Sequence, residues 1–403
     1  PVFDDFVAAL GTHHGLDDDR LWARAAEGGA PTEQPLEPWP TGYELPLTPA
    51  QRDVYAAVSV AEDSVAYNVT GLTISTGGVS GGLDEALAGL VSRHDALRTT
   101  FHERHGRLVQ VVHPEMAVTA EHLDLGALEV GQTHESRARE AMAAFVRPFR
   151  LDEGPLIRVG CFSFDDGVTC LAIDVHHIVT DGASMGVLIH DLNVLLNGGA
   201  LPPLARPYRA VVTEVLQRLN EVDLAPHEDY WRGVFAEGVP RLELPTDRRR
   251  TGVVAGRGET VSALVGPELL AGAKEYASER GLTLFMVLFG VLHQVLSRAS
   301  GQDDLVIGTP VMGRANLRDH EHIGMFVNTL PVRLATERGW TVGDFTSAMR
   351  ATVLDAFAHQ ALPLERLIAA LGTPRDPGRR PLFDVCYAHQ NIDMGLDFDD
   401  GTT

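Results

Sequence analysis

Strand-like and helix-like segments alternate along almost the whole chain, and this alternation is the strongest constraint on its fold. Residues 107–112 and 168–175 are rich in the β-branched and apolar residues of strands. Residues 83–91 and 285–292 instead carry apolar side chains at helical spacing. Mixed elements spread over most of the 403 residues predict α/β lobes rather than a helix bundle or a β-sandwich.

The charge balance limits the kinds of partner. The 33 basic and 55 acidic residues leave a formal net charge of −22, which argues against nucleic acids and membranes, since both bind basic surfaces. Cys161, Cys170 and Cys386 are too few and too scattered for a disulfide scaffold or a zinc site. No apolar run reaches the ~18 residues of a membrane span, and the first residues lack the features of a signal peptide. We therefore expect a cytoplasmic protein.

The stretch His-His-Ile-Val-Thr-Asp-Gly at 176–182 follows the strand predicted at 168–175 and precedes an apolar helix. Alternation places His177 on the apolar face of that strand and His176 on the other face. A metal site is disfavoured, because these histidines point apart and no third ligand lies nearby. Two interpretations remain. His177 is a general base at a strand end with Asp181 organising the loop, or it is a buried histidine beside a turn aspartate.

The arrangement His-His-x-x-x-Asp-Gly resembles the active-site motif of condensation domains of nonribosomal peptide synthetases, within the chloramphenicol-acetyltransferase-like acyltransferases. Six further segments resemble that family and occur in its order, covering residues 45 to 390. They are LTPAQRDVY at 47–55, RHDALRTTF at 93–101, YWR at 230–232 with LELPTDR at 242–248, GTPVMGR at 308–314, IGMFVNTLPVR at 323–333 and RDPGRRPLF at 375–383. Two segments, at 208–212 and 359–365, depart from the family pattern and leave the donor and acceptor class open.

The resemblance implies an α/β (α+β) fold of two chloramphenicol-acetyltransferase-like lobes. These lobes would form a V-shaped pseudo-dimer with an active-site tunnel between them. We expect the N-terminal lobe at 45–207 and the C-terminal lobe at 208–403. The chain stops soon after the last matching segment, so we expect the second lobe to be truncated at its end.

The implied activity is peptide-bond formation by an acyltransferase. A donor acyl or peptidyl thioester and an acceptor aminoacyl thioester would arrive on the phosphopantetheine of upstream and downstream carrier proteins. No tightly bound cofactor and no metal is expected. A free-standing acyltransferase that uses coenzyme A, and a non-catalytic domain that recruits a partner, are the alternatives. The sequence leaves open both substrates, the donor stereochemistry, amide or ester formation, and whether the chain comes from a larger multimodular synthetase.

The resemblance assigns the catalytic role to His177, either as a base or as a group that positions the nucleophile. His176 is expected to pack or to anchor the loop. Asp181 is expected to be a buried structural carboxylate, because buried carboxylates are normally paired. The resemblance suggests Arg93 or Arg98 as its partner.

Three further residues are candidates for shaping the site. Gly182 is expected to let backbone approach the substrate or to adopt a positive φ. Ser184 is expected to lie along the substrate tunnel and to orient the loop, with capping of the following helix as the alternative. Asn328 is expected to line the tunnel as a hydrogen-bond donor, with a strand-capping role as the alternative.

Residues 1–34 differ from the rest and resemble the small helix and β-hairpin docking domains that precede some condensation domains. The proline-rich stretch 35–44 is predicted to be a linker. We hypothesise that the hairpin edge binds a C-terminal peptide of an upstream synthetase by strand addition. The alternative is a solvated linker.

Two arginine groups are candidates for docking a carrier protein: Arg248–Arg250, and Arg375 with Arg379 and Arg380. Carrier proteins are usually acidic, so the net charge of this chain cannot attract them and any docking patch must be local. A guanidinium group can bind a phosphate through two hydrogen bonds. The alternative is that these are solvated loop arginines.

Overall fold

The computed structural model describes residues 42–60, 63–75, 82–221, 224–247, 259–314, 316–373 and 379–390. The docking segment predicted at 1–34 lies outside these residues, as do Arg248–Arg250 and Arg375. The linker predicted at 35–44 lies mostly outside them as well, and its last two residues belong to strand β1 (Tyr43–Pro46).

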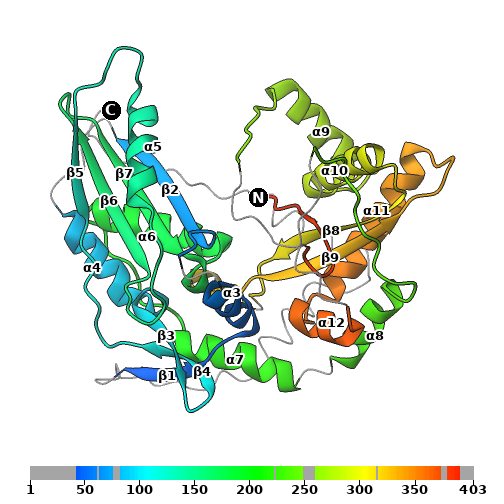
Figure 1. Cartoon of the computed structure of the whole chain (residues 1–403), viewed down its shortest axis with the longest axis horizontal. Coiled ribbons are helices and arrows are strands. Elements are labelled where there is room, and N and C mark those ends of the chain that lie inside the picture. Colours follow the sequence, from blue (N-terminus) through cyan, green and yellow to red (C-terminus); the bar gives the residue numbers. More distant parts are fainter. Residues whose placement is uncertain are drawn as a thin grey trace. The chain divides into compact units, whose positions relative to one another are not determined.

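The described chain forms two compact units of mixed helices and strands (Figure 1). The first unit contains the described residues of 42–221 together with 312–327, and the second those of 224–311 and 328–389. This division differs from the lobes predicted at 45–207 and 208–403. Helix α7 (Tyr208–Glu221) belongs to the first unit, and the chain returns to that unit at 312–327.

The first unit contains two sheets, whose strands pair in the orders β2-β7-β6-β5 and β1-β4-β3. The strands are β2 (Asn68–Ser75), β3 (Thr99–Arg104), β4 (Arg107–Val112), β5 (Glu121–Gly126), β6 (Ile157–Phe164) and β7 (Thr169–His176). The helices are α3 (Pro49–Val60), α4 (Leu83–Arg93), α5 (His134–Phe145) and α6 (Gly182–Leu196), with the 3-10 turns η1 (Asp95–Arg98), η2 (His177–Val179) and η3 (Leu317–Glu321). Only β5 and β6 pair in parallel within these sheets.

Strand β7 is the buried centre of the four-stranded sheet, and all eight of its residues are buried. Ile173 and Val175 belong to the core formed with α4 and α6, whereas Cys170 and Ala172 belong to the core formed with α5. This alternation is the one predicted for the strand at 168–175. It makes β7 a rigid support for the residues that follow it.

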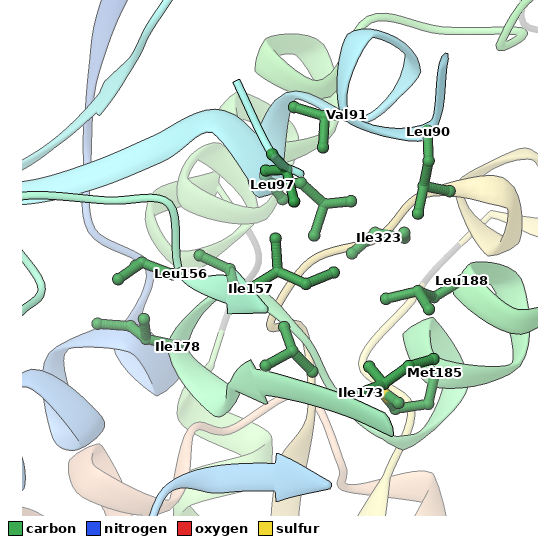
Figure 2. Close-up of a cluster of buried hydrophobic side chains, with 14 of the residues drawn as sticks. Leu90, Val91, Leu97, Leu156, Ile157, Ile173, Ile178, Met185, Leu188 and Ile323 are labelled. Carbon is green, nitrogen blue, oxygen red and sulfur yellow. The ribbon is translucent and has the colours of Figure 1, made fainter. Parts of the chain in front are cut away.

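The 312–327 segment contributes to the core that β7 forms with α4 and α6. Ile323 lies among side chains from β7 and the helices, including Leu90, Ile173 and Leu188, and it is 1% exposed (Figure 2). Burial of an isoleucine of this kind contributes about 1.5–3 kcal/mol to stability. The segment is therefore held in the first unit by its apolar residues.

The second unit is built on a three-stranded sheet of order β10-β8-β9. Its elements are α8 (Ala225–Val234), α9 (Pro267–Glu279), α10 (Leu284–Ser300), β8 (Asp304–Val311), β9 (Asn328–Ala335), α11 (Val342–Ala358), α12 (Leu364–Leu371) and β10 (Val385–Cys386). The helix predicted at 285–292 lies within α10. Strands β8 and β9 are antiparallel and Val311 pairs with Asn328, so 312–327 is the connection of a β-hairpin.

No single described helix is both long and apolar enough to span a membrane. The pair α9 and α10 meets the length and composition requirements only when taken together, and it is bent by 106°.

Candidate active site

The histidine motif lies where β7 ends. The strand ends at His176 rather than one residue earlier, and His177 is the first residue of the turn η2. The backbone N–H of His177 donates to the carbonyl of Tyr67 (2.7 Å), and the N–H of Thr180 donates to the carbonyl of His177 (3.3 Å). His177 is half-buried, while its neighbours His176 and Ile178 are 1% and 0% exposed. The turn therefore leaves one of the two imidazoles accessible.

His176 anchors this turn. Its Nδ1 accepts a hydrogen bond from the N–H of Ile178 (3.1 Å), and its ring lies against the rings of Tyr67 and Phe149. Burial, with smaller contributions from the nearby His177 and Arg158, lowers the pKa of His176 to about 4. The ring is neutral at physiological pH. These contacts agree with the loop-anchoring role expected for His176.

Asp181 caps helix α6. Its backbone is extended (φ −134°), and its Oδ1 accepts from the N–H of Ser184 (2.9 Å), an N-cap hydrogen bond. Gly182 is the first residue of the helix. The positive φ expected for Gly182 is therefore wrong, because a residue in a right-handed helix has a negative φ.

Asp181 forms a bidentate ion pair with Arg314. The Arg314 Nη1 donates to Oδ2 and Nη2 donates to Oδ1, each at 3.0 Å, and both side chains are shielded from solvent, at 0% exposure for Arg314 and 2% for Asp181. The backbone N–H of Phe326 also donates to Oδ2 (3.0 Å). Both carboxylate oxygens of Asp181 are thus fully used in structural hydrogen bonds.

The prediction that Arg93 or Arg98 pairs with Asp181 is wrong, because each has a carboxylate of its own. Arg93 donates to Asp191 (2.9 Å), which also bonds His94. Arg98 bonds Asp95 and the carbonyl of His113.

Sequence reasoning missed Arg314 as the partner. It ends the matching segment GTPVMGR at 308–314, so it could have been singled out as a family residue. No local pattern indicated that a hairpin connection would bring it to Asp181.

Ser184 joins the same cluster and is fully buried. Its hydroxyl accepts from Arg314 Nη2 (2.7 Å) and from the N–H of Gly324 (3.0 Å). It lies 2.8 Å from both Asp181 Oδ1 and the carbonyl of Gly324, either of which can take its single proton. These contacts fasten the 312–327 connection to α6. The complete burial of Ser184 argues against the tunnel position expected for it.

Asn328 has a structural role in the second unit. Its Nδ2 donates to the carbonyls of Gln360 and Leu362 (both 2.9 Å), and its Oδ1 accepts from the N–H of Leu364 (3.2 Å). Both amide hydrogens are used by the loop before α12. The predicted tunnel-lining donor is therefore replaced by the alternative, an anchor at the start of β9.

The two described arginines of the candidate docking patch differ in their surroundings. Arg379 donates to Asp384 (3.1 Å), Glu243 (2.9 Å) and the carbonyl of Leu242 (3.0 Å). It is committed to structural contacts, which argues against a phosphate-binding role. Arg380 is exposed, and together with Arg379 it lines a cavity of about 230 Å³.

Within the part of the chain that the structure describes, no group of three or more histidine, cysteine or acidic side chains is arranged to hold a metal ion.

Sequence comparison places the chain in a family. The model of the condensation domain matches residues 42–402. The chain is similar to tyrocidine synthase 2 of Brevibacillus parabrevis, with 35% identity over 378 residues, covering 93% of this chain and 10% of that protein. It is also similar to surfactin synthase subunit 2 of Bacillus subtilis (strain 168), with 33% identity over 372 residues, covering 92% and 10%. The chain thus spans about a tenth of the length of these relatives.

Solved structures agree on the fold. The first condensation domain of the CDA synthetase is similar with a TM-score of 0.71 and 22% identity, covering 88% of this chain and 84% of that one. A four-domain nonribosomal peptide synthetase bound to AMP and glycine is similar with a TM-score of 0.76 and 18% identity, covering 91% and 28%. The chain belongs to the condensation-domain family of nonribosomal peptide synthetases, the acyltransferases that form peptide bonds.

Proposed function

We propose that His177 is the catalytic residue with which this domain transfers a donor acyl or peptidyl group to the amine of an acceptor aminoacyl thioester. The observation that carries the proposal is that His177 is partly exposed on a turn whose neighbouring residues, His176 and Ile178, are fully buried. Both substrates are carried on the phosphopantetheine of carrier proteins. The arrangement of the two lobes as a V with a tunnel between them is part of the proposal and rests on the family resemblance.

The reaction forms one bond and breaks another. The acceptor nitrogen bonds to the carbonyl carbon of the donor thioester, the carbon–sulfur bond breaks, and one amine proton ends on the sulfur of the departing thiol. An α-amino group has a reference pKa of about 8, so an ammonium substrate must first lose one proton. A neutral imidazole at His177 can take or relay that proton.

Asp181 does not take part in proton transfer in this scheme. Both of its oxygens accept hydrogen bonds from Arg314, and it is shielded from solvent. Loss of this carboxylate would leave the buried guanidinium without a partner charge. Asp181 and Arg314 are therefore positioning residues that hold the start of α6.

The test is the substitution His177→Ala, with His190→Ala as its control. His190 is an exposed histidine on helix α6, which follows the turn that carries His177. Intact-protein mass spectrometry of a donor and an acceptor carrier protein would follow transfer of the acyl group. We expect His177→Ala to abolish transfer with a Tm within a few degrees of the unmodified domain, and His190→Ala to retain it.

A rate above a tenth of the original in His177→Ala would overturn the general-base role. A second comparison uses the same acyl group on coenzyme A and on the carrier protein. A kcat/KM for the coenzyme A thioester that equals or exceeds that for the carrier would favour the free-standing acyltransferase instead.

A further inference from the structure

Among the described residues, no side chain forms a hydrogen bond with the buried ring nitrogen of His177, Nδ1. Catalytic histidines are commonly held by a partner on the nitrogen that does not react. Here the position of the ring therefore depends on the backbone of the turn η2, and the groups that hold this backbone determine where the ring lies.

Hydrogen bonds hold the backbone of Ile178, directly after His177, at both its N–H and its carbonyl group. Its N–H donates to His176, as described above, and its carbonyl accepts from Nε2 of Gln51 (3.4 Å). Gln51 lies in the first turn of α3, and it is 1% exposed. A glutamine 127 positions earlier in the chain thus contacts the catalytic turn.

The amide of Gln51 is fixed in one orientation. Its Oε1 accepts from the N–H of Thr48 (2.9 Å), and its own N–H donates to Thr48 Oγ1 (3.3 Å), which is the reciprocal pattern of a capping box. Since Thr48 supplies a donor, the oxygen of the Gln51 amide must face it. Its nitrogen then faces Ile178.

A second buried amide locks this orientation. Gln110 of β4 donates through Nε2 to Gln51 Oε1 (3.0 Å) and to the carbonyl of Pro46 (2.9 Å). Its Oε1 accepts from the hydroxyl of Tyr208 (3.2 Å). Rotating the amide of Gln51 would break these contacts in a buried environment, where each unmade hydrogen bond is costly.

We propose that Gln51 is a positioning residue for peptide-bond formation, which holds the carbonyl of Ile178 and thereby the imidazole of His177. The inference rests on the proposed function of His177. Gln51 does not touch the substrate, so its loss should lower kcat and leave KM nearly unchanged. A small misplacement of a reacting group can lower the rate by about 100-fold. We expect a loss of about tenfold or more, since His176 and Tyr67 still hold the turn.

The first test compares Gln51→Met with Gln110→Met. Both substitutions remove an equally buried amide of the same pair, but only Gln51 bonds to the turn in the described structure. We expect similar losses of Tm and a much larger loss of kcat in Gln51→Met. If the two variants lose the same amount of kcat and the same amount of Tm, the inference is overturned and Gln51 is only a core residue.

The second test is Gln51→Glu, which keeps an oxygen for Thr48 and loses the N–H to Ile178. Burial raises the pKa of a carboxyl group, and only the protonated carboxyl can donate to the Ile178 carbonyl. The ratio of variant to original kcat should therefore rise as the pH falls, at a temperature below both Tm values. A ratio independent of pH would contradict the inference, and this variant applies even if Gln51→Met does not fold.

A readout independent of activity is the imidazole NMR signal of His177, identified by its absence in His177→Ala. We expect Gln51→Met to shift this signal more than Gln110→Met does. An unmodified domain that transfers no acyl group would refute the proposed function. An active domain with unchanged kcat and an unshifted signal in Gln51→Met would refute only the role of Gln51.

Discussion

Asp181 and Arg314 lie 133 positions apart in the chain and form a bidentate ion pair that is shielded from solvent on both sides. The backbone N–H groups of Ser184 and Phe326 donate further hydrogen bonds to the same carboxylate. Removing one member of such a pair leaves a buried charge without compensation. The pair therefore couples the start of α6 to the 312–327 connection.

The first prediction concerns this pair. Asp181→Ala and Arg314→Ala should each lower the free energy of unfolding by about 3–5 kcal/mol, measured by chemical denaturation. The control is Arg139→Ala, which breaks an exposed pair with Glu135 and should cost at most about 1 kcal/mol. A stable but inactive Asp181→Ala protein would show that the carboxylate acts in the chemistry instead.

Ser184→Ala should destabilise the domain less than the loss of Asp181. Without the hydroxyl, the N–H and carbonyl of Gly324 lose their partner in a buried site, at a cost of about 1–3 kcal/mol. Ser59→Ala is the matched control, because the hydroxyl of Ser59 is exposed and bonds only its own helix in the described structure. Equal midpoints of denaturation for the two variants would contradict this role of Ser184.

Stability should fall in mild acid. Burial lowers the pKa of His176 and of His322 from 6.5 to about 4, so between these values the unfolded chain binds more protons than the folded one. The free energy of unfolding therefore decreases as the pH falls from about 6.5 to about 4, by about 3 kcal/mol for each ring. Above pH 7 these two rings should contribute no pH dependence.

The measurement is the free energy of unfolding as a function of pH, for the unmodified domain and for His322→Gln. The variant lacks one of the titrating rings. Between pH 6.5 and 4, the free energy of unfolding of this variant should change less steeply with pH. The reason is that the variant takes up at most one proton fewer on unfolding. An unchanged slope would assign the acid sensitivity to other groups.

Charge reversal should have different effects at Arg379 and Arg380, the two described arginines of the candidate docking patch. Arg379→Glu should destabilise the second unit, because it places a carboxylate beside Asp384 and Glu243. Arg380→Glu should leave the Tm unchanged and raise the KM for a carrier-bound substrate, if the patch receives a carrier phosphate. Turnover of a small soluble thioester should stay the same in Arg380→Glu, and an unaltered KM for the carrier would exclude the patch.

The local features of the site could be predicted from the sequence. The alternation of apolar residues predicted the strand before the histidines, although not the burial of both its faces, and the apolar residues after Gly182 predicted the following helix. These features depend on residues close together in the chain, whose periodicity reflects the geometry of strands and helices.

The partner of Asp181 could not be predicted in the same way. The family resemblance suggested Arg93 or Arg98 as the partner. In the structure, Arg93 pairs with Asp191 and Arg98 pairs with Asp95. Arg314 reaches Asp181 because the connection between β8 and β9 belongs to the first unit. A pairing at this separation depends on the topology of the chain, and a single sequence carries no local signal for it.

The β8–β9 connection also sets a rule for recombining this domain with related ones. A chimera joined once, near residue 207 or 223, would take Asp181 and Ser184 from one parent and Arg314 from the other. It would also mix the apolar contacts of Ile323 with the side chains around it. A gene exchange that keeps the first unit intact must therefore transfer two separate pieces, residues 42–221 and 312–327, from the same parent.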